Sequence, residues 1–272
     1  MEASFGISIW AQLALGLLLG VAVALGARRA SMLTGGGAIA AATLGALTFG
    51  IGGLAPSILL LTFFLSSSLL SRQGSERKQS LAERSAKGSK RDEWQVLANG
   101  AVPALLAVGY GLTDQSLWLV GVTGALAASN ADTWATEIGV LARNRPRMIT
   151  NLRAVEAGTS GAISLLGSVA ALAGALLIGL VASLLASNIG LLYAAGAAGL
   201  LASFIDSLLG ATLQAQYRCP NCDHLTEKHP THTCGTATEL VGGWGWLGND
   251  QVNLIASIAG AALAPLLWSA LS

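Results

Sequence analysis

The segment LWLVGVTGALAASNADTWATEIGVL (residues 117–141) decides how the chain folds. It begins as an apolar run suited to a bilayer, whose hydrocarbon core of about 30 Å needs roughly 20 helical residues. Its second half carries the carboxylates of Asp132 and Glu137, each of which costs on the order of 3 kcal/mol in the middle of a membrane span. We therefore expect a membrane helix that turns these groups toward a cavity with a function.

The composition of the whole chain is that of a membrane protein. Of its 272 residues, 53% are hydrophobic and 11% are charged, whereas soluble domains carry about 25% charged residues. These values exclude a disordered chain and a coiled coil and argue against a water-soluble globule. The net charge of +1 predicts no nucleic-acid partner.

Apolar segments recur along the chain and predict an all-α polytopic membrane helix bundle of about eight spans, forming one domain over residues 1–272. The first segment lacks a basic leader and a cleavage signal, so it is expected to be retained as a helix. The second and third are separated only by GGLAP (52–56) and form either a tight hairpin or one broken element. The expected spans lie near residues 5–26, 33–53, 55–70, 95–112, 117–141, 160–181, 188–213 and 250–271.

The basic residues predict the orientation of the bundle. All 15 Lys and Arg fall in the Arg28–Arg29 turn or in the loops 71–94, 142–158 and 214–248. Eight spans place these four stretches on one side, which is the cytoplasmic side by the positive-inside rule. Both termini are then expected on the outer side.

Seven polar side chains interrupt the apolar segments, each in the half of its span nearest the basic loops. One polar cavity open to the cytoplasm would hold them all, and carboxylate and amide oxygens are the ligands that hard cations such as Mg²⁺ prefer. The alternative is a set of isolated hydrogen bonds between helices. The seven residues are Asn99, Asn130, Asp132, Glu137, Asp206, Asp250 and Asn253.

Two of these acids belong to the same segment. On a regular helix Asp132 and Glu137 point in different directions, because successive residues turn by about 100°. They cannot both bind one metal from such a helix. Either the helix breaks near Ser129–Asn130, or Glu137 has another role.

The basic loops have two interpretations. Their charges can set the topology and contact anionic lipid headgroups, or they can hold phosphates above the acidic cavity. Lys78, Arg147 and Arg153 are the candidate phosphate clamps, and Thr159 and Ser160 are expected to open a helix whose N-terminus favours anions. No Walker-type or kinase-type glycine loop is present, which excludes the usual soluble ATP-binding folds.

All three cysteines lie in the loop 214–248, together with three histidines. A Cys-x-x-Cys pair followed by a His and a third Cys offers the tetrahedral sulfur and nitrogen set that suits Zn²⁺. Uncoordinated thiols are the alternative, since a disulfide is disfavoured on the reducing side of the membrane. We expect structural zinc to fold a small cytoplasmic knuckle inserted before the last helix. The expected ligands are Cys219, Cys222, His232 and Cys234.

Seven segments together resemble the domain-of-unknown-function 92 family, which includes the transmembrane protein 19 group and the plant phytyl-phosphate kinase. The resemblance runs in order from about residue 33 to residue 272. The cysteine loop is not a feature expected throughout this family. The segments are FFLSSSLL (63–70), QVLANG (95–100), NADTWATE (130–137), PRMIT (146–150), GTSG (158–161), DSLLGATLQ (206–214) and NDQVN (249–253).

The resemblance implies a membrane kinase. Such an enzyme transfers a phosphoryl group from a nucleoside triphosphate, CTP being favoured, to an isoprenoid monophosphate such as phytyl or geranylgeranyl phosphate. In this interpretation Asp132, Asp206 and Asp250 hold Mg²⁺, and Glu137 orients the reactants. Asn99, Asn130 and Asn253 contact nucleotide or substrate, while the isoprenoid tail lies along apolar helix faces.

Two other classes of function remain in competition. Acids inside membrane spans and glycine-broken helices also mark the pathways of ion and small-solute transporters. A lipid-binding scaffold without turnover is the third class. The bias of the polar groups toward one side favours the enzyme, because a carrier places its site near the middle of the bilayer.

Overall fold

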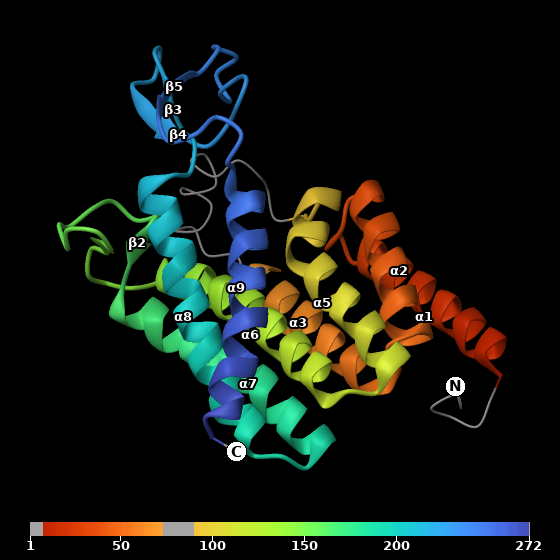
Figure 1. Cartoon of the computed structure of the whole chain (residues 1–272). Helices are drawn as coiled ribbons and strands as arrows, with labels where there is room; N and C mark the ends of the chain where they lie inside the picture. Colours follow the sequence, from red (N-terminus) through yellow and green to blue (C-terminus); the bar gives the residue numbers. More distant parts are fainter. Residues whose placement is uncertain (1–7, 73–89, 272) are drawn as a thin grey trace.

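The computed structural model describes residues 8–72 and 90–271. The described chain forms a bundle of long α-helices with a small β-structure at one end (Figure 1). The all-α membrane bundle expected from the sequence is confirmed. Its helices are α1 (Ile9–Arg29), α2 (Gly35–Gly50), α3 (Leu54–Arg72), α5 (Glu93–Thr113), α6 (Ser116–Gly139), α7 (Leu165–Ala186), α8 (Gly190–Thr212) and α9 (Asn249–Ser269).

Six of these helices are long and apolar enough to cross a membrane. The exceptions are α2, which has only 16 residues, and α6, which is long but more polar. The break between α2 and α3 is a tight turn in which Gly53 has a φ of 81°. The second and third segments are therefore a hairpin of two helices rather than one broken element.

Helix α6 lies in the centre of the bundle. It packs against α3, α5, α7, α8 and α9, and every residue from Leu119 to Ala131 is buried. This position explains why α6 tolerates polar residues: neighbouring helices, rather than lipid, surround it. A polar side chain in such a place meets protein groups or a cavity.

Glycines let the helices around α6 approach closely. A Cβ on Gly124 of α6 would collide with the carbonyl oxygen of Gly260 on α9. A Cβ on Gly16 of α1 would lie 2.8 Å from the Cα of Gly50 on α2. Packing of small residues drives helix association in membranes, where no hydrophobic force acts between helices.

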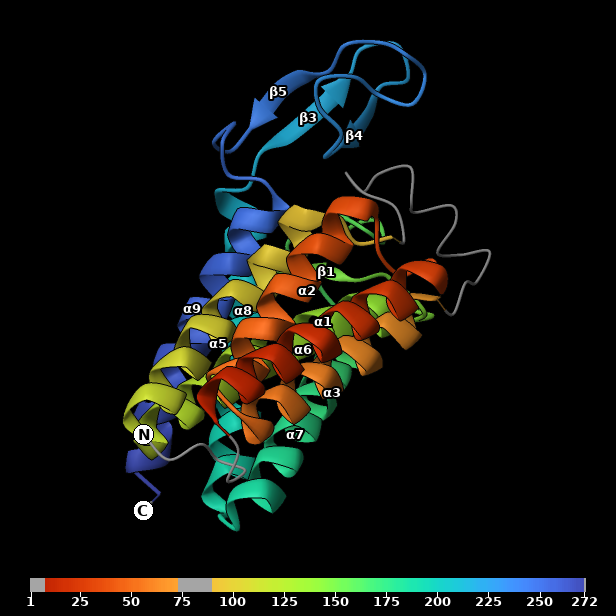
Figure 2. The same ribbon diagram turned by 90° about the vertical axis from the view of Figure 1, so that its right-hand side faces the viewer.

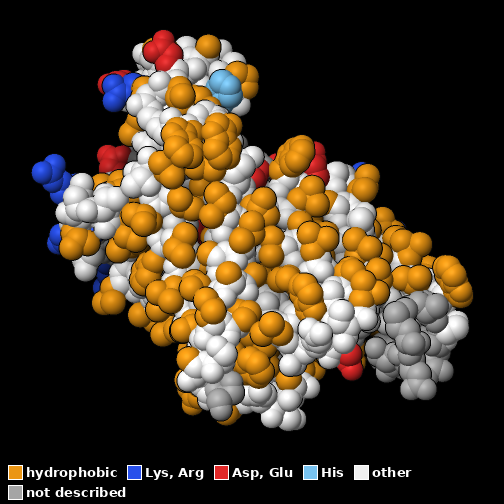
Figure 3. Space-filling model, in the orientation of Figure 1, with side chains coloured by type: hydrophobic (Ala, Val, Ile, Leu, Met, Phe, Trp, Pro, Cys, Tyr) orange, Lys and Arg blue, Asp and Glu red, His pale blue; other side chains and the backbone are white. Residues whose placement is uncertain are grey.

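The outer surface of the bundle is apolar, as expected for a protein surrounded by lipid (Figure 3). Leucines that would be buried in a soluble protein are exposed, including Leu18 on α1, Leu105 on α5 and Leu184 on α7. Apolar patches of this extent on a water-soluble monomer would be unusual. The chain is an integral membrane protein with several membrane-spanning helices.

Successive helices run in opposite directions, so the connections at residues 30–34, 140–164 and 213–248 lie at one end of the bundle. The start of α1 and the end of α9 lie at the other end (Figure 2). We call the end of the bundle that carries the three connections the loop end. This arrangement agrees with the predicted grouping of the basic loops and of the two termini. Which side of the membrane the loop end faces stays a prediction.

The loop end carries two small sheets that the sequence did not predict. Strands β1 (Arg147–Met148) and β2 (Ala162–Ile163) pair within the connection between α6 and α7. Residues 214–248, which we call the knob, contain β3 (Gln216–Cys219), β4 (His224–Thr226) and β5 (Glu239–Gly242). These form an antiparallel sheet in the order β4-β3-β5. The knob stands on the ends of α8 and α9 (Figure 1).

The sixth predicted span begins five residues too early. Residues 160–164 are not helical, because Gly161 has a φ of 78° and Ala162–Ile163 pair with β1. Helix α7 begins after Ser164, whose side chain accepts a hydrogen bond from the backbone N–H of Gly167. The expectation that Thr159 and Ser160 open a helix was therefore wrong.

Candidate functional site

A polar cavity of about 650 Å³ lies at the loop end of the bundle, between the helices and the knob. Helices α5, α6, α7, α8 and α9 form its walls, the connection between α6 and α7 forms one side, and the knob covers it. Eight of the predicted site residues converge here from distant parts of the sequence. They are Asn99, Asp132, Glu137, Thr159, Ser160, Asp206, Asp250 and Asn253.

Three aspartates from three helices face this cavity. Asp132 lies on α6, Asp206 on α8, and Asp250 is the second residue of α9. Asp206 is close enough to Asp132 to interact electrostatically with it, and also with Glu227 of the knob. Carboxylates that share a low-dielectric site repel one another, and a cation between them removes this repulsion.

The donor atoms fit a hard cation. Oδ2 of Asp206 and Oδ1 of Asn253 are buried, and neither has a hydrogen-bond partner among the described residues. Such atoms are costly unless something else occupies their lone pairs. Mg²⁺ prefers carboxylate and carbonyl oxygens, so Asp132, Asp206, Asp250 and Asn253 are the residues that would hold it.

Glu137 lines the same cavity, but in a different place. Helix α6 is continuous through Ser129–Asn130, so the alternative in which it breaks there is wrong. Glu137 lies near the end of α6 and attracts the guanidinium of Arg91 electrostatically. Of the two alternatives, the one in which Glu137 does not share a metal with Asp132 remains.

Arg91 is the basic side chain that the sequence analysis missed. It lines the cavity, and its guanidinium carbon lies 5.5 Å from the centre of the Phe63 ring. Burial lowers its pKa to about 10, and the charge of Glu137 opposes this shift. At neutral pH the side chain therefore stays protonated.

The backbone of Arg91 is fixed against the turn between α1 and α2. Its N–H donates to the carbonyl of Met32 over 3.0 Å, and its carbonyl accepts from the N–H of Thr34 over 3.0 Å. A Cβ on Gly37 would collide with the carbonyl oxygen of Arg91. The glycines at the start of α2 are therefore needed for close packing, and the close packing places Arg91.

The predicted phosphate clamps are not at the cavity. Arg147 and Arg153 are exposed, and neither lines it. The Nη1 of Arg147 donates instead to the carbonyl of Leu152 over 2.8 Å. Lys78 lies outside the described residues. Among the described bases, Arg91 takes the place that the sequence analysis assigned to Arg147 and Arg153.

Asn130 also has a different role from the one expected. It is completely buried and does not line the cavity. Its Oδ1 accepts hydrogen bonds from Ser66 and Ser67 of α3 over 2.9 and 3.0 Å. Its Nδ2 donates to the carbonyl of Gly174 of α7 over 2.8 Å. Asn130 thus joins three helices. For this residue the alternative interpretation, hydrogen bonding between helices, is the one that applies.

Hydrogen bonds among three residues join the knob to the connection between α6 and α7. The hydroxyl of Ser160 donates to Oε1 of Gln214 over 3.0 Å, and Nε2 of Gln214 donates to Oε1 of Glu227 over 2.8 Å. All three side chains line the cavity. The chain of hydrogen bonds therefore holds the cover of the cavity against its side.

A second cavity, of about 300 Å³, lies beside the first among α1, α2, α3 and α5. Its lining is almost entirely apolar and includes Leu44, Phe49 and Phe64. The two cavities share Arg91, Gln95 and Asn99. No sequence pattern predicted this apolar cavity, because it depends on how four helices pack.

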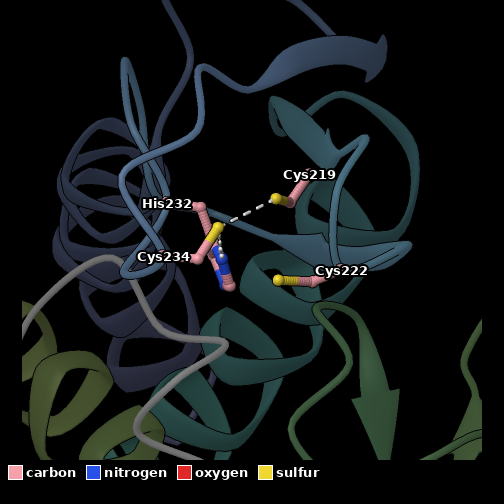
Figure 4. A group of neighbouring side chains, drawn as sticks. All are labelled: Cys219, Cys222, His232 and Cys234. Atoms are coloured by element: carbon pink, nitrogen blue, oxygen red, sulfur yellow. Dashed lines mark hydrogen bonds between the residues drawn. The ribbon is translucent and has the colours of Figure 1, made fainter.

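The predicted zinc ligands converge within the knob (Figure 4). The ligand atoms of Cys219, Cys222, His232 and Cys234 all lie within 4.8 Å of one another. Hydrogen bonding to Thr236 and His232 lowers the pKa of Cys234 to about 5. Hydrogen bonding to Cys234, with burial, raises the pKa of Cys222 to about 11.

Fold and site together define a polytopic helical membrane protein with an acidic cavity at one end of its bundle. The chain belongs to the DUF92 family of integral membrane proteins, whose pattern matches residues 18–261. The resemblance seen in its seven sequence segments is thereby confirmed.

Relatives of the chain occur in archaea, plants and cyanobacteria. An uncharacterized membrane protein of Methanocaldococcus jannaschii is 32% identical over 260 residues, which cover 94% of each chain. Protein PGR of Arabidopsis thaliana is 32% identical over 223 residues, 72% of this chain and 76% of that one. An uncharacterized membrane protein of Synechocystis is 27% identical over 215 residues, 76% of this chain and 71% of the relative. No solved structure matches the chain.

Proposed function

We propose that this protein is a membrane kinase that phosphorylates an isoprenoid monophosphate to the diphosphate. The observation that carries the proposal is the contact between the two cavities. The polar cavity contains three aspartates, the apolar cavity lies beside it, and Arg91, Gln95 and Asn99 line both. A molecule that fits both places has an apolar tail and an anionic head, with the head next to Arg91.

Arg91 suits the phosphate of such a molecule. A guanidinium binds phosphate oxygens through two parallel hydrogen bonds, and these are among the stronger hydrogen bonds in proteins. The side chain is charged and lies where the tail cavity meets the acidic cavity. We therefore assign it to the acceptor phosphate, whose isoprenoid chain would extend among α1, α2, α3 and α5.

The donor nucleotide belongs in the acidic cavity. The volume of this cavity, about 650 Å³, lies within the range of roughly 300–1,000 Å³ that is usual for small-molecule sites. Thr159, Ser160 and Gln214 offer hydrogen-bonding groups at one side of it. CTP as the favoured donor follows from the resemblance to the phytyl-phosphate kinase.

The reaction joins one phosphate to another. An oxygen of the acceptor monophosphate attacks the γ-phosphorus, the bond from that phosphorus to the β–γ bridging oxygen breaks, and the nucleoside diphosphate leaves. The acceptor is already ionised, so no strong general base is needed, and catalysis rests on positioning and on charge stabilisation. Mg²⁺ bound by the aspartates would neutralise the phosphate oxygens of the donor.

The place of the site along the bundle favours an enzyme over a transporter. Asp250 is at the very start of α9, and Asp132 and Asp206 lie seven and six residues from the ends of α6 and α8. A carrier holds its substrate near the middle of the bilayer. We also propose that the loop end faces the cytoplasm, where nucleoside triphosphates are available.

The direct test uses the purified full-length chain in detergent. It is incubated with phytyl or geranylgeranyl monophosphate, Mg²⁺ and CTP labelled at the γ-phosphate. We expect labelled isoprenoid diphosphate, and a competition with ATP then reports the nucleotide preference. Absence of product with every isoprenoid phosphate tested, from protein shown to be folded, would reject the kinase. Uptake of a solute by proteoliposomes in that case would favour the transporter.

The substitution Ala41→Phe tests whether the isoprenoid tail occupies the apolar cavity. Ala41 lines this cavity from α2, and a phenyl ring there fills space that a long chain needs. Burial of each CH₂ contributes about 0.8 kcal/mol, so we expect activity on geranylgeranyl phosphate to fall by about tenfold or more. Activity on dimethylallyl phosphate should change little.

Ala22→Phe is the matched control. Ala22 is an exposed alanine of α1 that does not line the apolar cavity, so this substitution adds the same ring on the lipid-facing surface. In Ala22→Phe, the ratio of the activity on geranylgeranyl phosphate to the activity on dimethylallyl phosphate should equal that of the wild type. Equal loss for long and short acceptors in Ala41→Phe would place the tail elsewhere.

A further inference from the structure

The four metal-ligating side chains of the knob come from two turns. Cys219 and Cys222 belong to the turn between β3 and β4, which the N–H of Asp223 closes on the carbonyl of Cys219 over 2.9 Å. His232 and Cys234 belong to a second turn, which the N–H of Gly235 closes on the carbonyl of His232 over 2.9 Å. Each turn therefore presents two ligands to the space between them (Figure 4).

Their spacing matches a tetrahedral metal centre. The Sγ atoms of Cys219 and Cys234 are 3.5 Å apart, and Nδ1 of His232 is 3.3 Å from Sγ of Cys234. Zn–S bonds of about 2.3 Å in a tetrahedron separate two sulfurs by roughly 3.8 Å. All four ligand atoms lie within 4.8 Å of one another, so movements of about 1 Å would bring them to these separations.

We infer that Cys219, Cys222, His232 and Cys234 bind one structural Zn²⁺, and that this ion holds the knob in place as the roof of the acidic cavity. Four protein ligands fill a tetrahedral zinc site completely, so no position is left for substrate. Three sulfurs and one nitrogen favour Zn²⁺ over Mg²⁺, which prefers oxygen.

The knob needs such an ion because it has little core of its own. Its three strands are three or four residues long, and several of its apolar side chains, including Leu225, Leu240 and Val241, are exposed. Cys219, by contrast, is completely buried at the centre. A unit of this size buries too little apolar surface to fold alone and commonly depends on a metal.

The same ion is connected to the cavity through short stretches of chain. Tyr217 lies two residues before Cys219, and His229 lies three residues before His232. The rings of Tyr217 and His229 stack with their centres 4.6 Å apart, and both line the cavity together with Glu227. Fixing the two turns on one ion therefore fixes the side chains with which the knob lines the cavity.

The first test is metal analysis of the full-length protein purified under reducing conditions. We expect about one zinc per chain in the wild type, and less than about a tenth of that in His232→Ala and Cys222→Ser, since each loses a ligand of a four-coordinate site. His224→Ala is the matched control, because His224 is an exposed histidine of the same knob and lies outside the cluster. Its zinc content should equal that of the wild type.

The second test is limited proteolysis. Arg218 and Lys228 are the basic residues of the knob, so trypsin cleavage there reports whether the knob is folded. A zinc-selective chelator, or His232→Ala, should increase cleavage at both sites by about tenfold or more, because removal of structural zinc unfolds the segment it orders. Added Zn²⁺ should restore resistance in the chelated wild type and not in the variant.

Neither test uses a substrate, so the outcome does not depend on the proposed kinase activity. Iron in place of zinc, a Cys219–Cys234 disulfide in the freshly purified protein, or equal zinc loss in His224→Ala and His232→Ala would overturn the site. A knob that stays resistant to trypsin after its zinc is removed would overturn the structural role.

Discussion

Asp206→Asn should abolish most of the turnover while leaving the folded protein at least as stable in the absence of Mg²⁺. Asp206 interacts with the charges of Asp132 and Glu227, and its buried Oδ2 has no hydrogen-bond partner among the described residues. An amide of the same shape removes repulsion from the metal-free site, but it lacks the negative charge with which the carboxylate attracts Mg²⁺. We expect kcat to fall by about 100- to 1,000-fold, the loss usual when one preorganised electrostatic group is removed.

Thermal unfolding in detergent separates this effect from misfolding. Mg²⁺ that binds the folded wild type raises its stability by about 2.7 kcal/mol at 100 times its Kd, so the wild-type Tm should rise with Mg²⁺ concentration. The Tm of Asp206→Asn should not change with Mg²⁺ concentration. Asp114→Asn is the control, because Asp114 ends α5 far from the cavity in a left-handed conformation that asparagine also adopts. If the two variants lose activity equally, the aspartate centre is not the active site.

Arg91→Ala should raise KM for the isoprenoid phosphate far more than it changes Mg²⁺ binding. The side chain lines both cavities and is assigned to the acceptor phosphate. A hydrogen bond to a charged group contributes about 1.5–3 kcal/mol, which corresponds to roughly a 10- to 100-fold increase in KM. Steady-state kinetics with the isoprenoid phosphate varied and CTP saturating measure this change.

Arg153→Ala and chemical rescue are the controls for Arg91. Arg153 is exposed and does not line the cavity, so its removal should leave KM unchanged. Guanidinium ions at concentrations below those that denature the protein should partly restore the activity of Arg91→Ala, which loss of a purely structural contact would not allow. A larger increase in KM for Arg153→Ala than for Arg91→Ala would show that Arg153, as first expected from the sequence, binds the phosphate.

The difference between Arg91 and Arg153 illustrates how far sequence patterns reach. Both are basic residues in loops at the same end of the bundle, and nothing in their local sequence distinguishes them. Arg91 reaches the cavity because its backbone pairs with the turn that precedes α2, and Gly37 allows the close approach. Contacts between segments so far apart in the chain leave no periodic signal.

Asn130 and Asp132 are a second such case, two residues apart on one helix. The sequence placed both among the polar groups of α6, yet the structure directs Asn130 to Ser66, Ser67 and Gly174 and Asp132 to the cavity. A separation of two residues turns a side chain by about 200° around a helix. Which of the two directions meets a cavity depends on the neighbouring helices.

By itself, the sequence determined that the chain forms membrane helices, that their basic connections share one end, and which four side chains gather in the knob. Hydropathy, charge and ligand spacing are properties of short segments, and each has a direct physical consequence for those segments. Only the tertiary structure decided that Arg91 joins the three aspartates in the cavity predicted for them, that Asn130 stays outside it, and that an apolar cavity lies alongside. Cavities are spaces left between packed helices, so they depend on close contacts among side chains that the linear order does not bring together.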